Sequence, residues 1–299
     1  MINASYLEKL DKCNLCPNKC NVNRNFTVGK CKVGNLPVVA KAYLHKGEEP
    51  VLTGKNGSGT VFFSGCTLSC VFCQNYTISQ NNYGKAISIK RLADIFKELE
   101  EQGATNINLV TATPHIYFII DALNIYKPNI PIVFNSGGYE NVETLKLLDG
   151  IVDIYLPDFK YYDNALAKQF SGCDNYLQIV IPAINEMINQ VGSPIIENGV
   201  MKKGVIVRHL ILPTYTSDSI NVINAIKDNF QNKVLVSLLG QYTPIKTDNI
   251  YKELNKKITK LEYKRVLNHM LNIGLDKGFF QDLDSSSEIY IPNFDLQGV

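Results

Sequence analysis

Short apolar runs alternate with amphipathic helical patterns along most of this 299-residue chain, and this alternation restricts the fold more than any other feature. The runs are almost entirely apolar, which is typical of strands buried on both faces of a parallel sheet. Six such units are fewer than a closed eight-stranded barrel needs, so they predict an open partial barrel or a doubly wound α/β sheet. The predicted strands are residues 59–65, 106–110, 130–136, 151–159, 205–213 and 234–240, and the predicted helices are 88–103, 114–126, 141–150, 164–170, 176–191, 217–230 and 259–274.

Polar side chains follow these strands at the point where each one ends. In both candidate folds, ligands bind at the C-terminal ends of the strands. We therefore expect a functional site to be built from these residues. They are Cys66, Cys70 and Cys73 after the first strand, Thr111 after the second, Asn135 in the third, Asp158 and Lys160 after the fourth, and Gln241 and Tyr242 after the sixth.

Charge and composition limit the classes of partner. The formal net charge is only +2, which gives no case for nucleic acid or an anionic membrane as an obligatory partner. The N-terminus is too polar for a signal peptide, and no run has the roughly 18 apolar residues of a membrane helix. We expect a cytoplasmic protein, and in that compartment clustered cysteines more often bind metal than form disulfides.

The cysteines at positions 66, 70 and 73 form a C-x3-C-x2-C pattern with no further Cys or His directly following. Thiolates are soft ligands that favour zinc, Cu(I) or iron–sulfur clusters. Three of them can hold three corners of a four-iron cluster and leave one iron open for a substrate. The alternative is a structural zinc site completed by a distant histidine such as His45 or His115.

The triplet also carries a family resemblance, because the residue before its third cysteine is the aromatic Phe72. This pattern resembles the signature of radical S-adenosylmethionine (SAM) enzymes. The segments HKGEEPVLTGKNGSGTVFFSGCTLSCVFCQN, VDIYLPDFKYY, VRHLILP, GQYTP and FDLQGV resemble the PflX-like branch, which is similar to pyruvate formate-lyase activating enzymes. The resemblance covers nearly the whole chain and implies a partial (β/α)6 barrel with a small Cys-rich N-terminal extension.

The resemblance also implies roles for individual residues. Cys66, Cys70 and Cys73 would hold a [4Fe–4S] cluster whose open iron binds SAM, with Phe72 near the adenine. Asp158 and Lys160 resemble the D-x-K element that assists the cosubstrate's carboxylate. We add three candidates for cofactor binding, namely Arg208, an arginine within an apolar strand, and Asn135 and Thr111 at the strand ends. The glycine-rich GGE-type element of the activating enzymes is replaced here by TATPH, so its role does not transfer.

A second group of cysteines lies near the N-terminus. Cys13, Cys16, Cys20 and Cys31 follow a C-x2-C-x3-C-x10-C pattern in a segment without periodic structure. Four thiolates can hold either a structural zinc or an auxiliary iron–sulfur cluster, and the sequence leaves both interpretations open. We expect three parts in the chain, a Cys-rich segment (1–59), the barrel (60–275) and a C-terminal tail that packs on the barrel (276–299).

The functional hypothesis is a radical SAM enzyme that cleaves SAM reductively and uses the 5′-deoxyadenosyl radical for hydrogen abstraction, as a glycyl-radical-enzyme activase. One alternative is hydrogen abstraction from another protein, a peptide or a small molecule, since cofactor chemistry does not fix the substrate. Another, of a different class, is an iron–sulfur electron carrier with two clusters. The expected partners are SAM, an electron donor such as flavodoxin or ferredoxin, and a protein substrate.

Overall fold

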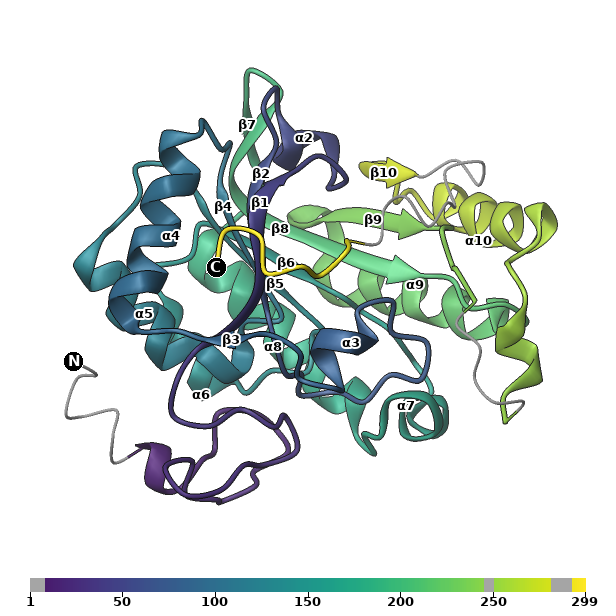
Figure 1. The fold of residues 1–299 in the computed structure, drawn as a ribbon. Helices are drawn as coiled ribbons and strands as arrows, with labels where there is room; N and C mark the ends of the chain where they lie inside the picture. Colours follow the sequence, from purple (N-terminus) through teal and green to yellow (C-terminus); the bar gives the residue numbers. More distant parts are fainter. Residues whose placement is uncertain (1–8, 245–249, 281–291) are drawn as a thin grey trace.

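The computed structural model describes residues 9–244, 250–280 and 292–299, and its strands form one ten-stranded sheet (Figure 1). Six strands are parallel neighbours in the order of the chain, as the alternating pattern predicts. In the described residues the two ends of the sheet are not paired with each other, so the barrel is partial and open. The six strands are β2 (Ser58–Phe63), β4 (Ile107–Val110), β5 (Ile132–Ser136), β6 (Ile154–Pro157), β8 (Val200–Leu210) and β9 (Leu235–Leu239).

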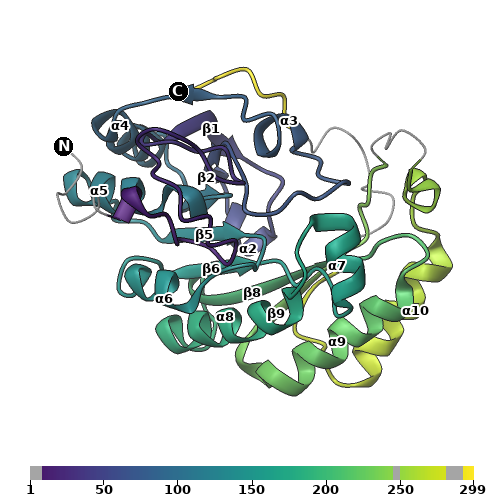
Figure 2. The same ribbon diagram turned by 90° about the horizontal axis from the view of Figure 1, so that it is seen from below.

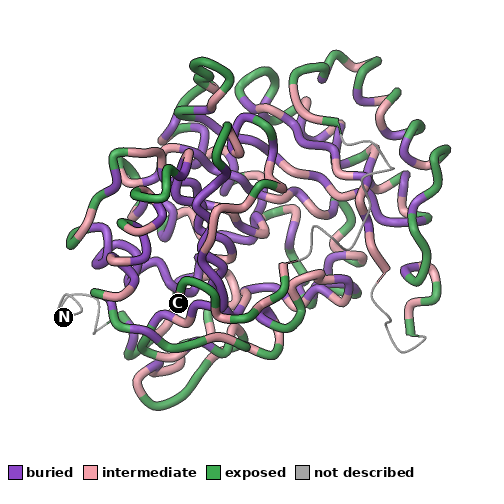
Figure 3. The backbone as a smooth tube through the Cα atoms, turned by 45° about the horizontal axis from the view of Figure 1, so that its top comes forward, coloured by how far each residue is buried: buried purple, intermediate pink, exposed green. Residues whose placement is uncertain are grey.

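Helices form an outer layer around the curved sheet (Figure 2). Their apolar faces pack on the sheet, as in α4, where Ser88 caps the first turn by accepting a hydrogen bond from the Arg91 amide. Burial is greatest between this layer and the sheet (Figure 3). The helices are α4 (Ile89–Glu101), α5 (Ile116–Ile125), α6 (Val142–Leu145), α7 (Asn164–Ser171), α8 (Tyr176–Val191), α9 (Thr216–Phe230) and α10 (Lys260–Asn272), with short α2 (Pro50–Thr53) and α3 (Tyr76–Ser79).

Short 3-10 segments explain the differences from two of the predicted helices. The helix predicted for residues 114–126 is a 3-10 turn, Thr113–His115, followed by α5, and residues 141–150 contain α6 and the turn Lys146–Leu148. Helix α8 has the bounds that the sequence predicts. Two further 3-10 turns are Gln231–Lys233 and Lys252–Asn255.

The sequence pattern missed strand β1 (Val38–His45), which pairs antiparallel with β2. The predicted boundary between residues 59 and 60 therefore cuts through this pair of strands, and the sheet extends back to Val38. The short strand β3 (Lys85–Ala86) pairs with β1 at the edge, and β7 (Ile195–Glu197) forms a hairpin with β8. The Cys-rich loops thus precede β1 rather than filling all of residues 1–59.

The described parts of the C-terminal tail contact the sheet at two places. Strand β10 (Gly278–Phe280) pairs in parallel with β9. Gln297 accepts a hydrogen bond from the Ala42 amide at 2.8 Å, and the Phe294 ring meets that of Phe62 edge-on at 5.6 Å. The remainder of the predicted tail, residues 281–291, and the first eight residues of the Cys-rich segment lie outside the described residues. Among the helices that are described, none is long and apolar enough to cross a membrane.

Candidate functional site

A cavity of about 570 Å³ lies at the C-terminal ends of the parallel strands. This volume is typical of a small-molecule site. Every residue that we predicted from the strand ends and the triplet, apart from Tyr242, lines it. These residues are Cys66, Cys70, Phe72, Cys73, Thr111, Asn135, Asp158, Lys160, Arg208 and Gln241.

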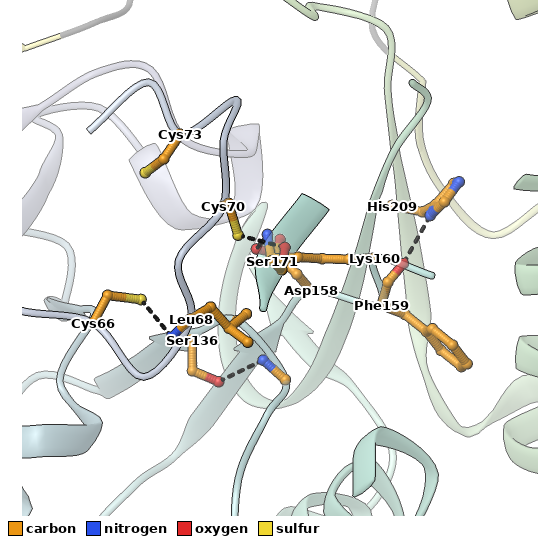
Figure 4. Close-up of polar contacts among 12 residues, drawn as sticks. Cys66, Leu68, Cys70, Cys73, Ser136, Asp158, Phe159, Lys160, Ser171 and His209 are labelled. Carbon is orange, nitrogen blue, oxygen red and sulfur yellow. Dashed lines mark hydrogen bonds and ion pairs between the residues drawn. The ribbon is translucent and has the colours of Figure 1, made fainter. Parts of the chain in front are cut away.

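The three cysteines come from one loop between β2 and α3 (Figure 4). Each sulfur has a hydrogen-bonding neighbour. The Leu68 amide donates to Cys66 Sγ at 3.4 Å, and the Ser171 hydroxyl donates to Cys70 Sγ at 2.9 Å. Cys73 Sγ lies 3.2 Å from the Ser79 hydroxyl. The loop therefore presents three supported sulfur atoms to one cavity.

Burial favours the neutral form of these three thiols when no cation is bound. Burial raises the pKa of the Cys66 and Cys70 thiols above their ordinary value, and it raises the pKa of Cys73 to about 11, with the Cys70 thiol adding to the shift. Three thiolates without a positive partner would be both desolvated and mutually repulsive. Metal cations remove this penalty, because a thiol binds a metal as its deprotonated form.

Neither histidine considered in the zinc alternative completes the triplet. His115 is fully buried, its Nε2 lies 2.8 Å from the Ser64 carbonyl, and its ring stacks on Phe63. His45 lines the cavity, but its Nδ1 accepts a hydrogen bond from the Tyr43 hydroxyl or donates to it at 2.7 Å. In the described part of the chain, no three His, Cys, Asp or Glu side chains are grouped around a single metal ion. Among these residues, neither histidine thus forms a single-ion site with the triplet.

Phe72 forms part of an aromatic wall beside the triplet. Its side chain is mostly buried and still reaches the cavity. Its ring centroid lies 6.5 Å from that of Tyr161 and 6.2 Å from that of Tyr242. Tyr242, which follows the sixth parallel strand, is held in place by a 2.8 Å hydrogen bond to the Leu254 carbonyl. A flat apolar group can pack against this wall.

Asp158 and Lys160 face the cavity together, as their spacing predicts. Lys160 Nζ lies 2.5 Å from Asp158 Oδ2, whereas the side chain of Phe159 between them is buried (Figure 4). Burial alone would lower the pKa of the Lys160 ammonium, but the Asp158 carboxylate and the nearby thiols raise it above its ordinary value. Lys160 therefore carries a positive charge beside the cysteine loop.

Thr111 and Asn135 lie at neighbouring strand ends and line the cavity. The Thr111 amide donates to the Asn135 carbonyl at 3.0 Å. Thr111 has a φ of +60°, a conformation that is costly for a β-branched residue. Strained residues of this kind concentrate at functional sites, because the surrounding structure must hold them in place.

Arg208 also lines the cavity, but two buried glutamates bind its guanidinium. Its Nε donates to Glu49 Oε1 at 2.8 Å, and its Nη2 donates to Glu49 Oε2 at 2.5 Å and to Glu48. We expected Arg208 to bind the cofactor, and here its partners are two carboxylates of the chain itself. Glu48 and Glu49 could not be predicted as its partners, because no local pattern links them to Arg208, which lies 160 and 159 positions further along the chain. Its neighbour His209 points into the core, where its Nδ1 lies 2.7 Å from the Phe159 carbonyl.

The four N-terminal cysteines are half-buried and lie in loops before β1. The eighth cysteine, Cys173, is buried and donates weakly to the Ala167 carbonyl at 3.6 Å, as an ordinary core thiol would.

Comparison with known families identifies the superfamily of the chain. A profile described as the radical SAM superfamily matches residues 60–252, more than half of the chain. This chain belongs to the radical SAM superfamily. Enzymes of this superfamily use a [4Fe–4S] cluster and SAM, and the chain is therefore a catalytic protein of this kind.

The chain is also similar to a curated protein in sequence and to solved structures in fold. The chain is 33% identical over 274 residues to the uncharacterized protein MJ0674 of Methanocaldococcus jannaschii, a match that covers 88% of this chain and 75% of that protein. The fold is similar to that of Streptococcus suis SuiB bound to S-adenosylmethionine, with a TM-score of 0.51, 13% identity, and coverage of 74% of this chain and 49% of that one. It is also similar to HydG, a maturase of the [FeFe]-hydrogenase, with a TM-score of 0.51, 14% identity, and coverage of 76% and 52%. The chain thus spans about half the length of these two solved structures.

The residues present fit the cofactor of the radical SAM superfamily. The cavity offers three soft sulfur donors from one loop, a positive charge on Lys160 and an aromatic wall at Phe72. Three cysteines can hold three irons of such a cluster and leave the fourth iron open to a ligand from outside the chain.

Proposed function

We propose that Cys66, Cys70 and Cys73 hold a [4Fe–4S] cluster in this cavity and that SAM binds beside them. When bound and reduced, the cluster supplies the electron that breaks the C5′–S bond of SAM, which gives methionine and a 5′-deoxyadenosyl radical. The single observation that carries this proposal is the group of three thiols from one loop, one buried and two half-buried, which line one cavity at the C-terminal edge of the sheet.

The residues around the triplet would bind and orient SAM. Phe72 offers an apolar face for the adenine. The Lys160 ammonium offers a charge-assisted hydrogen bond to the carboxylate of SAM, with Asp158 holding its position. Asn135 and Thr111 offer polar groups on neighbouring strand ends. The strand ends and the cysteine loop would together exclude water from the radical.

We assign Arg208 to the organisation of the cavity rather than to direct cofactor binding. Its hydrogen bonds to Glu48 and Glu49 fix two buried carboxylates at the cavity wall. The three groups together carry a net charge of about −1 when all are ionised, because one arginine faces two glutamates. A substrate with a cationic or hydrogen-bond-donating group would be favoured at this wall.

We propose a glycine Cα–H of a partner protein as the source of the abstracted hydrogen atom, which makes the protein an activating enzyme of the PflX-like branch. This choice rests on the resemblance of five sequence segments to activating enzymes. The glycyl radical that forms is stabilised by its two flanking amide groups.

A deuterium-transfer experiment tests the choice of substrate. A candidate glycyl-radical protein labelled with deuterium at the glycine α-carbons is mixed anaerobically with reconstituted enzyme, SAM and a reductant. We expect deuterium in the 5′-deoxyadenosine and a glycyl radical in the electron paramagnetic resonance (EPR) spectrum. Unlabelled 5′-deoxyadenosine without a glycyl radical would contradict the activase assignment for that partner and leave hydrogen abstraction from another protein, a peptide or a small molecule.

A further inference from the structure

The N-terminal cysteine segment is docked directly against the loop that carries the triplet. The Cys31 carbonyl packs on Gly65, where a Cβ would lie 2.4 Å from the carbonyl oxygen. Lys30 Nζ donates to the Gly172 carbonyl at 2.6 Å, next to the serine that donates to Cys70 Sγ. The buried Arg24 anchors the segment from the other side through a 2.9 Å hydrogen bond to the Pro114 carbonyl. The two cysteine groups are therefore fixed relative to each other.

One side chain and one peptide group connect a sulfur of the N-terminal group with a sulfur of the triplet. Asn18 Nδ2 lies 3.5 Å from Cys16 Sγ and donates to the Thr67 carbonyl at 2.7 Å. The other end of that peptide group, the Leu68 amide, donates to Cys66 Sγ at 3.4 Å (Figure 4). Adding these three distances to the width of a peptide group gives an upper limit of about 12 Å between the two sulfurs.

The four N-terminal thiols suit a cluster better than a single zinc ion. Cys31 lies close enough to the other three cysteines to interact with them electrostatically. Four sulfurs around one zinc, each at about 2.3 Å, would lie less than about 4 Å apart. No such single-ion group occurs among the described residues, neither here nor at the triplet that we assign to the [4Fe–4S] cluster.

The backbone around these thiols packs closely on Cys20 and turns sharply between the cysteines. Gly29 approaches Cys20 so closely that a Cβ would lie 2.8 Å from its Sγ. The Lys30 amide lies 3.5 Å from the same sulfur, as the donors to cluster sulfurs do. Lys19, Asn21 and Lys32 have φ values of +42°, +54° and +60°, which turn the chain sharply between the cysteines.

We propose that Cys13, Cys16, Cys20 and Cys31 hold a second iron–sulfur cluster that delivers electrons to the triplet site through Asn18 and the Thr67–Leu68 peptide group. An external one-electron donor, a flavoprotein or an iron–sulfur protein, reduces the second cluster by one electron. That electron moves to the [4Fe–4S] cluster at the triplet and then to the sulfonium of SAM, where the C5′–S bond breaks homolytically. No proton is transferred, and the second cluster returns to its oxidised state.

The surface of the segment fits an acidic donor. Between residues 9 and 33 the exposed charges are five lysines and one aspartate. Such a basic surface speeds association with an acidic electron carrier, and the effect weakens as salt is added. The lysines are Lys9, Lys12, Lys19, Lys30 and Lys32, and the aspartate is Asp11.

Metal analysis of the anaerobically reconstituted chain tests the second cluster. We expect about eight iron atoms per chain and about four in a Cys16→Ala, Cys20→Ala double variant. A second variant lacks the triplet and carries Cys66→Ala, Cys70→Ala and Cys73→Ala. For this variant we expect about four iron atoms per chain and an EPR signal that SAM does not change. A wild-type protein with about four iron atoms and one zinc would overturn the proposal.

The relay is tested by a substitution that leaves in place all seven cysteines proposed as cluster ligands. Asn18→Leu removes the link to Thr67, and Asn25→Leu in the same segment is the matched control, because Asn25 bonds Asp11 rather than the triplet loop. After rapid mixing with reduced flavodoxin, the triplet cluster is followed by the EPR signal that SAM alters. We expect reduction several-fold slower in Asn18→Leu, with unchanged iron content and with wild-type rates in Asn25→Leu. Equal rates in all three proteins would overturn the assigned path.

The relay rests on the proposed function. Reduction with dithionite, which does not need the second cluster, distinguishes a failure of the relay from a failure of the proposed function. With dithionite, the Cys16→Ala, Cys20→Ala variant should still make 5′-deoxyadenosine, whereas with reduced flavodoxin it should make several-fold less than the wild type. Equal yields with flavodoxin would contradict the relay alone. A wild type that makes no 5′-deoxyadenosine with either reductant would contradict the proposed function, while its iron count still tests the second cluster.

Discussion

The ion-pair group at the cavity wall gives the most quantitative prediction. In the Arg208→Met variant, Glu48 and Glu49 lose the cation that holds them. Their side chains are only 7% and 4% exposed, so water cannot replace it. Breaking a buried ion pair by removing one partner costs about 3–5 kcal/mol. We expect a loss of this size in the free energy of unfolding at pH 7.

The pH dependence of this loss has a defined sign. Burial favours the neutral form of Glu49, but Arg208 outweighs burial and lowers the pKa of the carboxyl in the wild type. The wild-type contribution is therefore present above the ordinary pKa and is lost in acid. Without Arg208, burial and the neighbouring carboxylate raise the pKa of Glu49. The Arg208→Met deficit should shrink as the pH falls from 7 to 5.

Urea unfolding of the metal-free, reduced protein measures the deficit. Arg265→Met is the matched control, because Arg265 is exposed and makes a single 3.4 Å hydrogen bond to Thr216. Its effect should stay within about 0.5 kcal/mol. Adding Glu49→Gln to Arg208→Met should restore at least about 1 kcal/mol, since it removes one of the unpaired charges. A deficit below about 1 kcal/mol for Arg208→Met, or one that does not change between pH 7 and 5, would refute the reasoning.

Three further substitutions test the core and the cavity. Burial lowers the pKa of His209 to about 4. The buried neutral ring therefore makes the free energy of unfolding fall by up to about 3 kcal/mol as the pH drops below about 6.5. Urea titrations of His209→Asn should lack this pH-dependent fall. Gly138→Ala would place a Cβ 2.1 Å from the Asp158 carbonyl, whereas Gly150→Ala, at a similar positive φ, meets nothing within 4 Å; thermal unfolding should therefore show a lower Tm for Gly138→Ala, and equal values would contradict the clash. Lys160→Met should weaken SAM binding by about 10- to 100-fold in equilibrium dialysis of the cluster-loaded protein, and unchanged affinity would remove Lys160 from the SAM site.

The alternating pattern was enough to predict the parallel part of the sheet. Apolar strands such as β4 and helices such as α8 are specified by local periodicity, because burial on a regular element repeats at a fixed spacing. Strand β1 lacks this signal. Lys41 in its middle is buried and paired with Asp295, a residue from the other end of the chain. A strand that contains a buried charged residue lacks a continuous apolar pattern, and the partner of that residue cannot be recognised when it lies far away in the sequence.

The cavity shows the same division between local and distant information. The triplet, Asp158 and Lys160 were found because each motif is short and lies at a strand end. The contact between Arg208 and Glu49 spans 159 residues, and the contact between Asn18 and Thr67 spans 49. No periodic pattern or motif predicts such pairs, because the residues come together only when the sheet folds.

Reductive cleavage of SAM at the cluster that we propose for the triplet is tested most directly by a measurement of 5′-deoxyadenosine. The protein is reconstituted anaerobically, reduced with dithionite and mixed with SAM, beside a Cys70→Ala control. This control keeps Cys66 and Cys73, which line the cavity in the wild type. We predict 5′-deoxyadenosine and methionine in equal amounts from the wild type and only background from the control. A wild-type protein with a loaded, reduced cluster that makes no more than the control would contradict the account.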